Sequence, residues 1–543
     1  MAVLTSKVQI KDSASIANRQ EMQLLIDELQ THMEKSRFQG KEKHIARARA
    51  KGKMLARERI ELLLDRDSPF LELLPLVGLK RKGSFGAGGT NVCGIGIVSG
   101  KLCMINSNVG TRKGGSVDYD TMWKSMRANQ ISTENKLPAI NMVESGGANL
   151  PDQAKIFNHG GKSFKDITNR SKMGLSTISM VFGNATAGGA YVPGMSDYAI
   201  FQKNAAKVFL AGPPLVKMAT NEVATDEELG GAEMHSRVSG VSDYLAEDER
   251  DAIRIARDIM RYVKTTTPHL TPESFTSPIY ESEDLLSIIP ADVKTPFDIR
   301  ELIMRVVDGS DFSEFKKEYG STLVTGYARI HGYPIGILGN NGVIFSESAN
   351  KGAQFIQLCN KNDIPILYIH NTTGYMVGKA YEEGGIIKNG AKLINAVSNS
   401  EVPHLTLMVG NSYGAGNYGM NGRSYNPRFL FTYPNAKLGV MGAEQLAGVM
   451  DIIQRAAAKK SGVEFDEAQG EMLRKMLIAE ADSKATAWHS TSEGWDDGVI
   501  DPRETRNYLG FAMTVIYNQP IKGADGYGAV SYTHLTLPTI YSV

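Results

Sequence analysis

The chain has 543 residues, more than a single hydrophobic core normally supports, so two domains of roughly 250 residues each are expected. Its 60 Lys and Arg residues against 59 Asp and Glu residues leave a net charge of +1, which argues against nucleic acid as a partner. Cys93, Cys103 and Cys359 are the only cysteines and form no CxxC pair, which argues against a disulfide framework and a zinc ribbon.

The N-terminal region lacks the apolar core of a signal peptide, and no later run reaches the roughly 18 apolar residues of a membrane span. We therefore expect no membrane association and a reducing compartment, which would be the cytoplasm of a bacterium or the mitochondrial matrix of a eukaryote. Charged and apolar residues alternate from Gln20 to Leu64, a pattern that predicts one or two surface helices.

Short, almost continuous apolar runs follow and are typical of buried strands. They cover residues 137–143, 177–183, 334–340, 365–370 and 405–410. Amphipathic helices are predicted at 247–263 and 390–400, where apolar residues recur with a period of 3.6. Alternating strands and helices predict an α/β fold with ligands at the carboxyl ends of the strands.

The two halves of the sequence repeat each other. GNATAGGAY at 183–191 aligns with GNSYGAGNY at 410–418, an offset of 410 − 183 = 227. The pair Pro138 and Pro365 has the same offset, and so does the pair Gly147 and Gly374. Three separated matches at one offset indicate an internal duplication.

Domain boundaries follow from composition. The stretch from Lys264 to Asp284 is rich in Pro, Thr and Ser and separates the halves. We expect a helical segment at 1–55, an N-terminal domain at 56–275 and a C-terminal domain at 285–529. The last residues, VSYTHLTLPTIYSV at 530–543, have the composition of a translated sequencing adaptor and are expected to be non-native.

Clusters of small residues follow one strand in each half. Ala187, Gly188, Gly189 and Ala190 follow the run at 177–183, and Gly414, Ala415 and Gly416 occupy the equivalent place in the second copy. Residues almost without side chains let a carbonyl oxygen approach successive backbone N–H groups, and a following helix N-terminus adds a favourable dipole. The pattern predicts two oxyanion holes made of backbone amides.

A competing interpretation is a serine hydrolase. Residues 410–414 match GxSxG with Ser412 as nucleophile, and Asp451 and His489 follow in the order of an α/β-hydrolase triad. The first copy has Ala185 in place of Ser412, and no HGGG-type segment precedes it, which weakens this hypothesis. A lone GxGxxG in the same stretch is weak support for a dinucleotide. No HExxH, phosphate-binding loop or His and Cys cluster occurs, so no metal is predicted.

Several polar residues near predicted strand ends have a functional and a structural interpretation. His370 could polarise a ligand or be a hydrogen-bonded structural histidine. Glu144 could be a base, or a cap or salt-bridge partner. Arg112 and Lys113 could contact a CoA phosphate or be solvated surface charges, and the asparagines at 340–341 could serve turn geometry alone.

The sequence resembles the carboxyltransferase β subunits of biotin-dependent acyl-CoA carboxylases from about Arg57 to about Gly528. The resemblance rests on SGGANLP, TAGGAYVPGMSD, ELGGAEMHSRVSGVSDY, GNNGVIFSESANKGAQFIQLC and GNSYGAGNYGMNGRSYNPRFLFTYPNA. Within the family these stretches are most similar to the 3-methylcrotonyl-CoA carboxylases. The resemblance implies an α/β fold of two duplicated crotonase-like (ClpP/crotonase) ββα-superhelix domains.

The resemblance also implies roles for the small residues. The N-terminal half would bind the acyl-CoA, with Gly188 and Gly189 holding the thioester enolate oxygen. The C-terminal half would bind carboxybiotin, with Ala415 and Gly416 holding the ureido oxygen. The surrounding acyl-CoA residues would be Gly146, Gly147, Ala187, Ala190 and Tyr191. The surrounding biotin residues would be Thr373, Gly374, Tyr375, Gly414 and Tyr418.

Partners follow from the same resemblance. The chain carries neither an AMKM-like biotin-attachment sequence nor an ATP-grasp module, so biotin would be delivered by a separate biotin carboxylase/biotin carrier α subunit. A homohexameric core is implied, with each active site shared between two subunits. Propionyl-CoA, geranyl-CoA and long-chain acyl-CoA stay open as substrates. A biotin-dependent acyl-CoA decarboxylase and a non-catalytic assembly scaffold are the alternatives from other classes.

Overall fold

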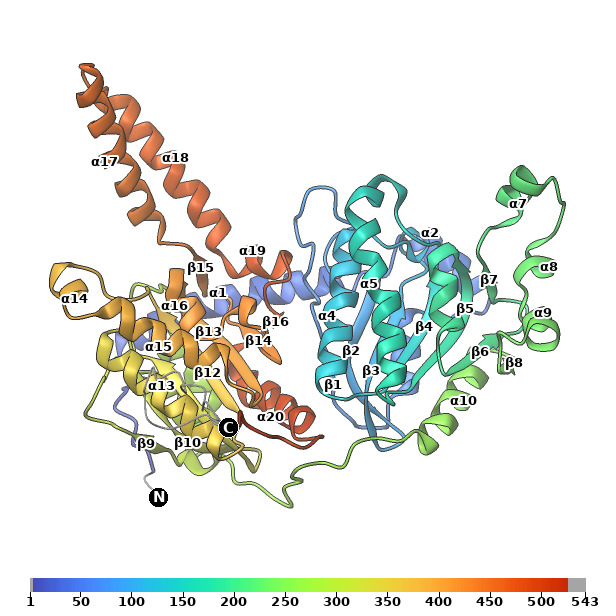
Figure 1. Cartoon of the computed structure of the whole chain (residues 1–543), viewed down its shortest axis with the longest axis horizontal. Coiled ribbons are helices and arrows are strands. Elements are labelled where there is room, and N and C mark those ends of the chain that lie inside the picture. Colours follow the sequence, from blue (N-terminus) through green and yellow to red (C-terminus); the bar gives the residue numbers. More distant parts are fainter. Residues whose placement is uncertain (1–2, 526–543) are drawn as a thin grey trace, which may run out of the picture. The chain divides into compact units, whose positions relative to one another are not determined.

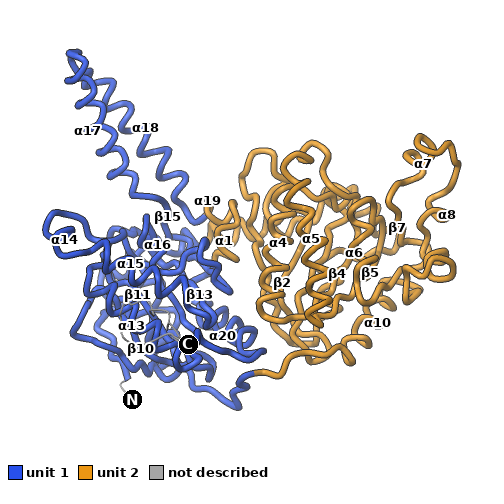
Figure 2. The backbone as a smooth tube through the Cα atoms, viewed as in Figure 1, with its two compact units in different colours: residues 1–26, 269–487, 500–543 blue, residues 27–268, 488–499 orange. Residues whose placement is uncertain are grey.

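The computed structural model describes residues 3–525 and divides into two compact units (Figures 1 and 2). The N-terminal unit, orange in Figure 2, comprises residues 27–268 and 488–499. The C-terminal unit, blue in Figure 2, comprises residues 3–26, 269–487 and 500–525. The predicted non-native tail at 530–543 lies outside the described residues.

An eight-stranded sheet forms the centre of the N-terminal unit. Its order is β1-β2-β3-β4-β5-β6-β8, with β7 paired to β5. Pairing is antiparallel from β1 to β3 and parallel from β3 onward. The strands are β1 (Phe70–Glu72), β2 (Asn91–Val98), β3 (Lys101–Asn108), β4 (Ala139–Ser145), β5 (Thr177–Thr186), β6 (Tyr198–Gln202), β7 (Lys207–Phe209) and β8 (Tyr244–Ala246). The strands predicted at 137–143 and 177–183 are thus confirmed as β4 and β5.

Helices bury apolar residues against this sheet. The predicted amphipathic helix at 247–263 is α10, which begins after the N-cap Asp248 and buries Ile253 and Met260 in the core. The helices of the unit are α2 (Glu42–Ala50), α3 (Ala56–Leu63), α4 (Tyr119–Glu134), α5 (Gln153–Lys172), α6 (Tyr191–Gly194), α7 (Pro213–Thr220), α8 (Asp226–Gly230), α9 (Ala232–Met234), α10 (Glu249–Tyr262) and α19 (Ala487–Ser492).

The N-terminal helices differ from the prediction. The chain forms three of them, α1 (Ser13–Ser36), α2 and α3, with Gly40 and Gly52 at positive φ between them. Helix α3 is not a surface helix, because Ile60 and Leu63 are buried in the core of the N-terminal unit. The charged residues of α3 suggested a surface helix in the sequence, but Arg59 forms its ion pairs inside the fold.

The sheet of the C-terminal unit repeats the same plan. The order β14-β13-β12-β11-β10-β9, with β15 paired to β13, is antiparallel from β9 to β11 and parallel from β11 onward. The strands are β9 (Ser313–Phe315), β10 (Leu323–Ile330), β11 (Tyr333–Asn340), β12 (Ile366–Thr372), β13 (His404–Tyr413), β14 (Phe429–Thr432) and β15 (Lys437–Gly439). A further short strand, β16 (Gly498–Val499), falls within the residues of the N-terminal unit. The strands predicted at 334–340, 365–370 and 405–410 are β11, β12 and β13.

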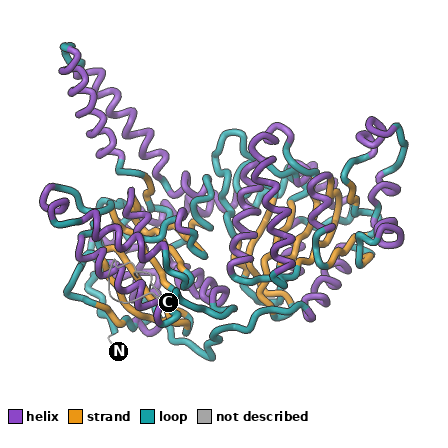
Figure 3. Tube along the Cα trace, in the orientation of Figure 1, coloured by secondary structure: helices purple, strands orange, loops and turns teal. Residues whose placement is uncertain are grey.

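The helices of the C-terminal unit include the predicted one at 390–400, which is α15. They are α11 (Leu285–Ile288), α12 (Ile299–Val306), α13 (Ser346–Lys361), α14 (Lys379–Glu383), α15 (Ile386–Ser398), α16 (Gly414–Gly419), α17 (Ala443–Ser461), α18 (Glu467–Ala485) and α20 (Thr505–Ile516). Helices α17 and α18 form a long hairpin that extends from the unit, with β15 near its base (Figures 1 and 3).

The predicted duplication is present in the fold. The first residues of β4 and β12 have the offset 366 − 139 = 227, and those of β5 and β13 have 404 − 177 = 227. Helices α4 and α13 share it, since 346 − 119 = 227. The offset between β2 and β10 is 323 − 91 = 232, so the spacing between equivalent elements of the two copies changes by only a few residues. Each half is therefore one copy of the same ββα architecture.

Within residues 3–525 the structure shows no helix long and apolar enough to cross a membrane. Over the same range it brings no three His, Cys, Asp or Glu side chains together as a metal site. The three cysteines are buried thiols.

Candidate active site

The first predicted small-residue cluster forms a sharp turn. Strand β5 ends at Thr186, and Ala187 has φ +55°, a left-handed conformation that is uncommon for a residue with a Cβ. A short 3₁₀ turn at Ala187–Ala190 continues into α6. The first N–H groups of a helix have no acceptor within it, so the turn presents backbone donors at exposed Gly188.

The second cluster forms the same turn. Strand β13 ends at Tyr413, Gly414 also has φ +55°, and α16 begins there. Gly414 and Ala187 have the offset of the duplication, 414 − 187 = 227, so the two turns are copies. Ala415 is exposed at the start of α16, where its N–H lacks an acceptor within the helix. Each unit thus carries one turn with unused backbone donors at the end of a parallel strand.

A glycine of the neighbouring loop lies against each turn. Gly147 has φ +89° and Gly374 has φ +123°, and their carbonyls accept hydrogen bonds from Val117 N at 2.9 Å and Ile344 N at 3.0 Å. A Cβ on Gly147 would lie 3.4 Å from the carbonyl oxygen of Thr186, the last residue before the Ala187 turn. The structure therefore brings these predicted residues together within each unit.

Not every predicted residue offers a donor. The N–H of Gly146 donates to Gly114 O at 3.0 Å, so this amide is used within the protein. Gly416 is buried, and a Cβ there would lie only 2.9 Å from Gly374 Cα. A Cβ on Gly189 would meet no atom within 4 Å. Glycine is therefore required by packing at 416, whereas at 189 it leaves space beside the amides.

Aromatic side chains border both turns. Tyr191 and Tyr418, which occupy equivalent positions in the two copies, are each 46% exposed. Tyr191 meets Phe164 edge to face with ring centroids 5.5 Å apart, and Phe164 lies 3.5 Å from the position of a Cβ on Gly188. Tyr418 stacks on Tyr425 at 6.1 Å. The turns thus sit beside apolar, partly exposed surfaces that suit an acyl chain or a ring.

Three further predicted residues lie beside the two turns, two of them near α16. Tyr375 packs beneath the helix, its hydroxyl donates to Gly390 O at 3.4 Å, and burial raises its pKa. Thr373 is exposed beside Gly374. In the other unit, Ala190 is buried beneath its turn. Thr373 is the one of these three that a ligand can reach.

The structure does not support the serine-hydrolase interpretation. Ser412 is completely buried and its hydroxyl contacts His370 Nδ1 at 2.8 Å. The Nε2 atom of His370 contacts Met420 O, which can only accept, so Nδ1 accepts from the serine. Asp451 instead pairs with Arg455 on α17 at 2.8 Å. His370 is therefore a structural histidine, and burial lowers its pKa to about 4.

Glu144 is a salt-bridge partner, as its structural interpretation proposed. Its carboxylate contacts Lys53 Nζ at 2.5 Å and Arg59 Nη1 at 2.9 Å. Burial alone would raise the pKa of Glu144, but the two cations outweigh burial and lower it. The group is ionised and its proton-accepting oxygens are occupied, so the structure gives it no role as a base.

Arg112 is neither a solvated surface charge nor free to contact a CoA phosphate. The side chain is buried, and its Nη1 donates to Ala87 O at 3.0 Å while the other guanidinium nitrogen contacts Phe85 O. It therefore holds a loop instead of facing solvent or a phosphate. Lys113 lies over the Phe85 ring at 5.3 Å. Of the asparagines at 340–341, the second accepts from Ile299 N at 2.8 Å and fixes the start of α12.

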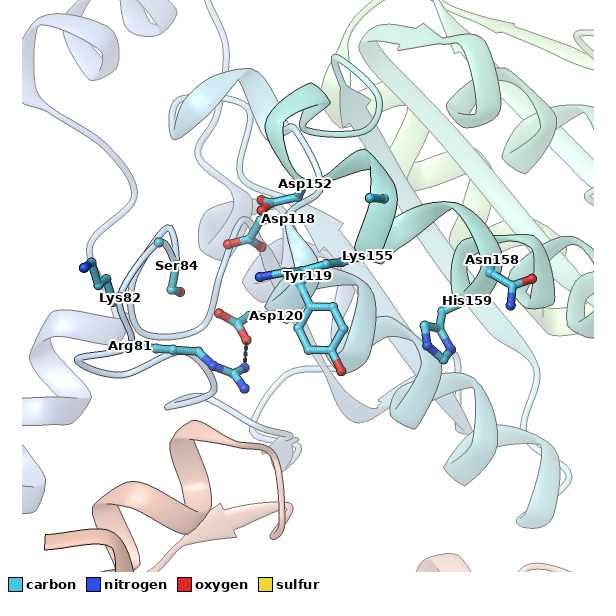
Figure 4. Close-up of a pocket in the computed structure, with 12 residues that line it drawn as sticks. Arg81, Lys82, Ser84, Asp118, Tyr119, Asp120, Asp152, Lys155, Asn158 and His159 are labelled. Carbon is cyan, nitrogen blue, oxygen red and sulfur yellow. Dashed lines mark hydrogen bonds and ion pairs between the residues drawn. The ribbon is translucent and has the colours of Figure 1, made fainter. Parts of the chain in front are cut away.

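A pocket of about 570 Å³ opens at the N-terminal ends of α4 and α5 (Figure 4). Two of its carboxylates already have partners within the protein: Asp120 pairs with Arg81, and Asp118 accepts a hydrogen bond from Thr121 N at 2.9 Å. Lys82 and Lys155 bring positive charge to the pocket wall. Sequence reasoning missed this pocket, because its residues come from three separate segments.

The sequence matches a known protein family and several of its members. Residues 47–525 match the family model described as carboxyl transferase domain. The chain is 53% identical to a probable biotin-dependent acyl-coenzyme A carboxylase beta2 subunit of Mycobacterium tuberculosis, over 93% of this chain and 95% of that protein. It is 44% identical to the biotin-dependent 3-methylcrotonyl-coenzyme A carboxylase beta1 subunit of the same organism, over 93% and 96%.

Among solved structures, the chain is similar to the beta subunit of geranyl-CoA carboxylase from P. aeruginosa. The sequence identity is 41%, the TM-score is 0.88, and the match covers 98% of this chain and all of that one. The predicted crotonase-like fold with two domains is confirmed by this likeness and by the repeated sheets.

Proposed function

The chain belongs to the carboxyl transferase domain family as the carboxyltransferase subunit of a biotin-dependent acyl-CoA carboxylase, and we propose that its acyl substrate is 3-methylcrotonyl-CoA. The pair of matching turns at Ala187 and Gly414, both at φ +55°, is the observation that carries the carboxyl-transfer chemistry. The 44% identity to a 3-methylcrotonyl-coenzyme A carboxylase beta1 subunit supports the choice of substrate. A reaction that passes through two enolate-like anions needs two sets of preorganised donors, and the chain offers one set in each unit.

In this proposal Gly188 and Gly189 hold the thioester oxygen of the acyl-CoA, and Ala415 and Gly416 hold the ureido oxygen of biotin. A backbone donor that meets charge only as it develops lowers the barrier by ~3 kcal/mol. When carboxybiotin is bound, it supplies CO2 and then the base for the acyl proton. Among residues 3–525, the proposal assigns the chemistry to oriented amides and gives no side chain the role of catalytic acid or base.

In this proposal the rest of the substrate binds to the N-terminal unit. Phe164 and Tyr191 border the Gly188 turn and would contact the acyl chain. The pocket at the ends of α4 and α5 includes Asp152, which follows Gly147 closely in the chain, and its Lys82 and Lys155 suit the phosphates of CoA.

We further propose that a separate subunit delivers the biotin and that the chain assembles as a homohexamer. The hairpin of α17 and α18 supports assembly, since it exposes apolar side chains that a monomer would leave in water. They are Val449, Ile452, Ile453, Met472 and Met476, between 45% and 68% exposed.

Geranyl-CoA is the second candidate substrate. The likeness to the geranyl-CoA carboxylase beta subunit, with a TM-score of 0.88, favours it. Both candidates are branched thioesters with a double bond next to the carbonyl, so the shape of the acyl pocket decides between them.

The test is single-turnover transfer of labelled carboxyl from acyl-CoA products to free biotin by the purified chain. Methylglutaconyl-CoA, carboxygeranyl-CoA, methylmalonyl-CoA and malonyl-CoA would be compared. Transfer from methylglutaconyl-CoA alone supports the proposal, and transfer from carboxygeranyl-CoA alone supports the second candidate. No transfer from any of them by a folded oligomer would favour the scaffold alternative.

A further inference from the structure

Strand β5 changes partners just before it reaches the Ala187 turn. It pairs with β6 up to Val181 and with β7 from Asn184 onward. Against β4 the register slips at the same place, because Val143 faces Val181 but Ser145 faces Ala185. Phe182 and Gly183 stand outside all three pairings. A bulge of this kind re-aims the end of a strand, and here that end carries the proposed acyl-CoA turn.

The bulge in β5 has one carbonyl that a lysine satisfies. Phe182 is completely buried, and its carbonyl accepts from Lys53 Nζ at 2.9 Å. Lys53 is held in turn by Glu144 at 2.5 Å. Glu144 also pairs with Arg59, whose guanidinium makes two hydrogen bonds to Glu249 at 2.7 and 2.8 Å. A buried carbonyl outside the ladder requires a donor, and this lysine supplies it.

The Glu144 side chain also packs against this bulge. A Cβ on Gly183 would lie 2.8 Å from Glu144 Cγ, so glycine is needed there. The charged cluster and the glycine together fix the path of β5 between Val181 and the turn.

Strand β13 contains the matching bulge with different chemistry. It pairs with β14 up to Met408 and with β15 from Asn411, and its register against β12 slips between His370 and Thr372. Val409, the counterpart of Phe182 in the second copy, is buried, and its carbonyl accepts from Asn435 Nδ2 at 3.0 Å. Asn435 also donates to Pro290 O at 2.8 Å. The neutral amide of Asn435 therefore donates to the bulge carbonyl of β13, as the Lys53 ammonium does to that of β5.

We propose that Lys53 and Asn435 are positioning residues, each holding one oxyanion turn through the bulge carbonyl behind it. The inference rests on the proposed function, because it assigns Lys53 to the acyl-CoA turn and Asn435 to the biotin turn. Neither side chain is the donor to substrate. Each sets the direction in which the strand end delivers the amides that follow it.

The two residues are separable by experiment because each acts within its own unit. Loss of Lys53 leaves Phe182 O without its donor and lets the 183–189 segment shift, while the bulge of β13 keeps Asn435. Loss of Asn435 has the mirror effect on 410–416. Misplacement of a reacting group by about 1 Å costs about 100-fold in rate, so a small shift is measurable.

The experiment uses Lys53→Met and Asn435→Leu in the full chain, with free biotin and the acyl-CoA product that the wild type accepts. For Lys53→Met we expect a KM for acyl-CoA raised about tenfold and a kcat lowered, with the KM for biotin within twofold of wild type. Asn435→Leu should reverse the pattern. Lys53→Arg, which keeps both donor and charge, should recover most of the KM change.

Lys101→Met is the matched control. Lys101 Nζ also donates to two backbone carbonyls of the N-terminal unit, Arg261 O at 2.8 Å and Val263 O at 2.6 Å, but it lies at the start of β3. Its loss should change neither KM. If Lys53→Met lowers only kcat, or changes both KM values alike, the residue is merely structural and the proposal is wrong.

Hydrogen exchange gives a readout independent of activity. Amides at 183–191 should exchange faster in Lys53→Met while those at 410–418 stay as in wild type, and Asn435→Leu should show the opposite. If Lys53→Met does not fold, Lys53→Gln replaces it with the same expected direction. Unchanged exchange at both turns overturns the inference even if transfer occurs. Absence of transfer by the wild type overturns the proposed function instead.

Discussion

Two glycines at equivalent positions, Gly189 and Gly416, meet very different surroundings. A methyl group on Gly416 would approach Gly374 Cα to 2.9 Å and Thr372 Cγ2 to 3.1 Å, so the backbone must move to accept it. We expect Gly416→Ala to destabilise the C-terminal unit by about 1–3 kcal/mol and to abolish most transfer to biotin. Thermal unfolding and the transfer assay measure the two effects.

Gly189→Ala is the control for this prediction. Since a Cβ there meets nothing within 4 Å, the unfolding temperature should be unchanged. Any loss of activity in this variant would then come from contact with the acyl-CoA. Equal destabilisation by both alanines would contradict the packing argument.

Two buried histidines make the C-terminal unit sensitive to acid. Burial lowers the pKa of His370 and of His404 to about 4, below the ordinary value near 6.5. The unfolded chain therefore binds protons that the folded chain excludes, and the stability present above pH 6.5 is lost as pH falls toward 4. We expect a loss of about 2 kcal/mol per histidine between pH 8 and pH 5, measured by urea unfolding.

The first half supplies the matched variant. Val143 and Ala185 occupy the positions of His370 and Ser412, so His370→Val with Ser412→Ala copies an arrangement that the same fold already accepts. This double variant should show a shallower dependence of stability on pH. An unchanged dependence would exclude His370 as a source of the acid sensitivity.

Which residues the sequence could identify depends on whether their signal is local. The small residues at 187–190 and 414–416 form a contiguous pattern that repeats, so the turns were predictable. Lys53 and Asn435 were not, because their roles arise from contacts across 129 and 26 residues. Arg112 resembled a surface charge because its acceptors are backbone carbonyls, which leave no mark on the sequence.

At the scale of elements, the buried strands were the most predictable feature. β4, β5, β11, β12 and β13 are buried on both faces and are therefore continuous apolar runs. The bulges were not predictable, since a slip in register changes which residues face each other without changing the run. Helix α3 was misplaced on the surface because its buried Arg59 suggested exposure.

The α17–α18 hairpin carries a prediction about assembly. Val449, Ile452 and Ile453 lie at helical spacing on one face of α17, and Met472 and Met476 lie at i, i+4 on α18. If these exposed apolar side chains of α17 and α18 are covered by another copy of the chain, the double variant Ile452→Asp with Met476→Asp should reduce the assembly to a smaller species. The smaller species should stay folded, as circular dichroism can show, because these side chains are mostly exposed within a single chain.

Light scattering coupled to size-exclusion chromatography measures the outcome. Lys459→Asp changes charge on the same helix without touching the apolar residues and should leave the mass unaltered. An unchanged mass in the double variant would show that the hairpin does not hold the oligomer together.

At the scale of the whole molecule, the duplication was readable because insertions and deletions between the copies are few. The offset between equivalent strands is 404 − 177 = 227 at β5 and β13, and it is 333 − 101 = 232 at β3 and β11. The return of residues 488–499 to the N-terminal unit was not readable. That segment follows the hairpin in sequence, and no change in composition marks its departure from the C-terminal unit.

The duplication also predicts a division of labour between the units. Tyr191 rests against Phe164, and its counterpart Tyr418 rests against Tyr425, so each exposed tyrosine has one aromatic support. Phe164→Ala should change the ratio of kcat/KM between methylglutaconyl-CoA and carboxygeranyl-CoA about tenfold, because it opens space beside Gly188. Tyr425→Ala should raise the KM for free biotin and leave that ratio unchanged. If either variant alters both quantities together, the two units do not act on separate substrates, and the duplicated turns would have to serve a single ligand.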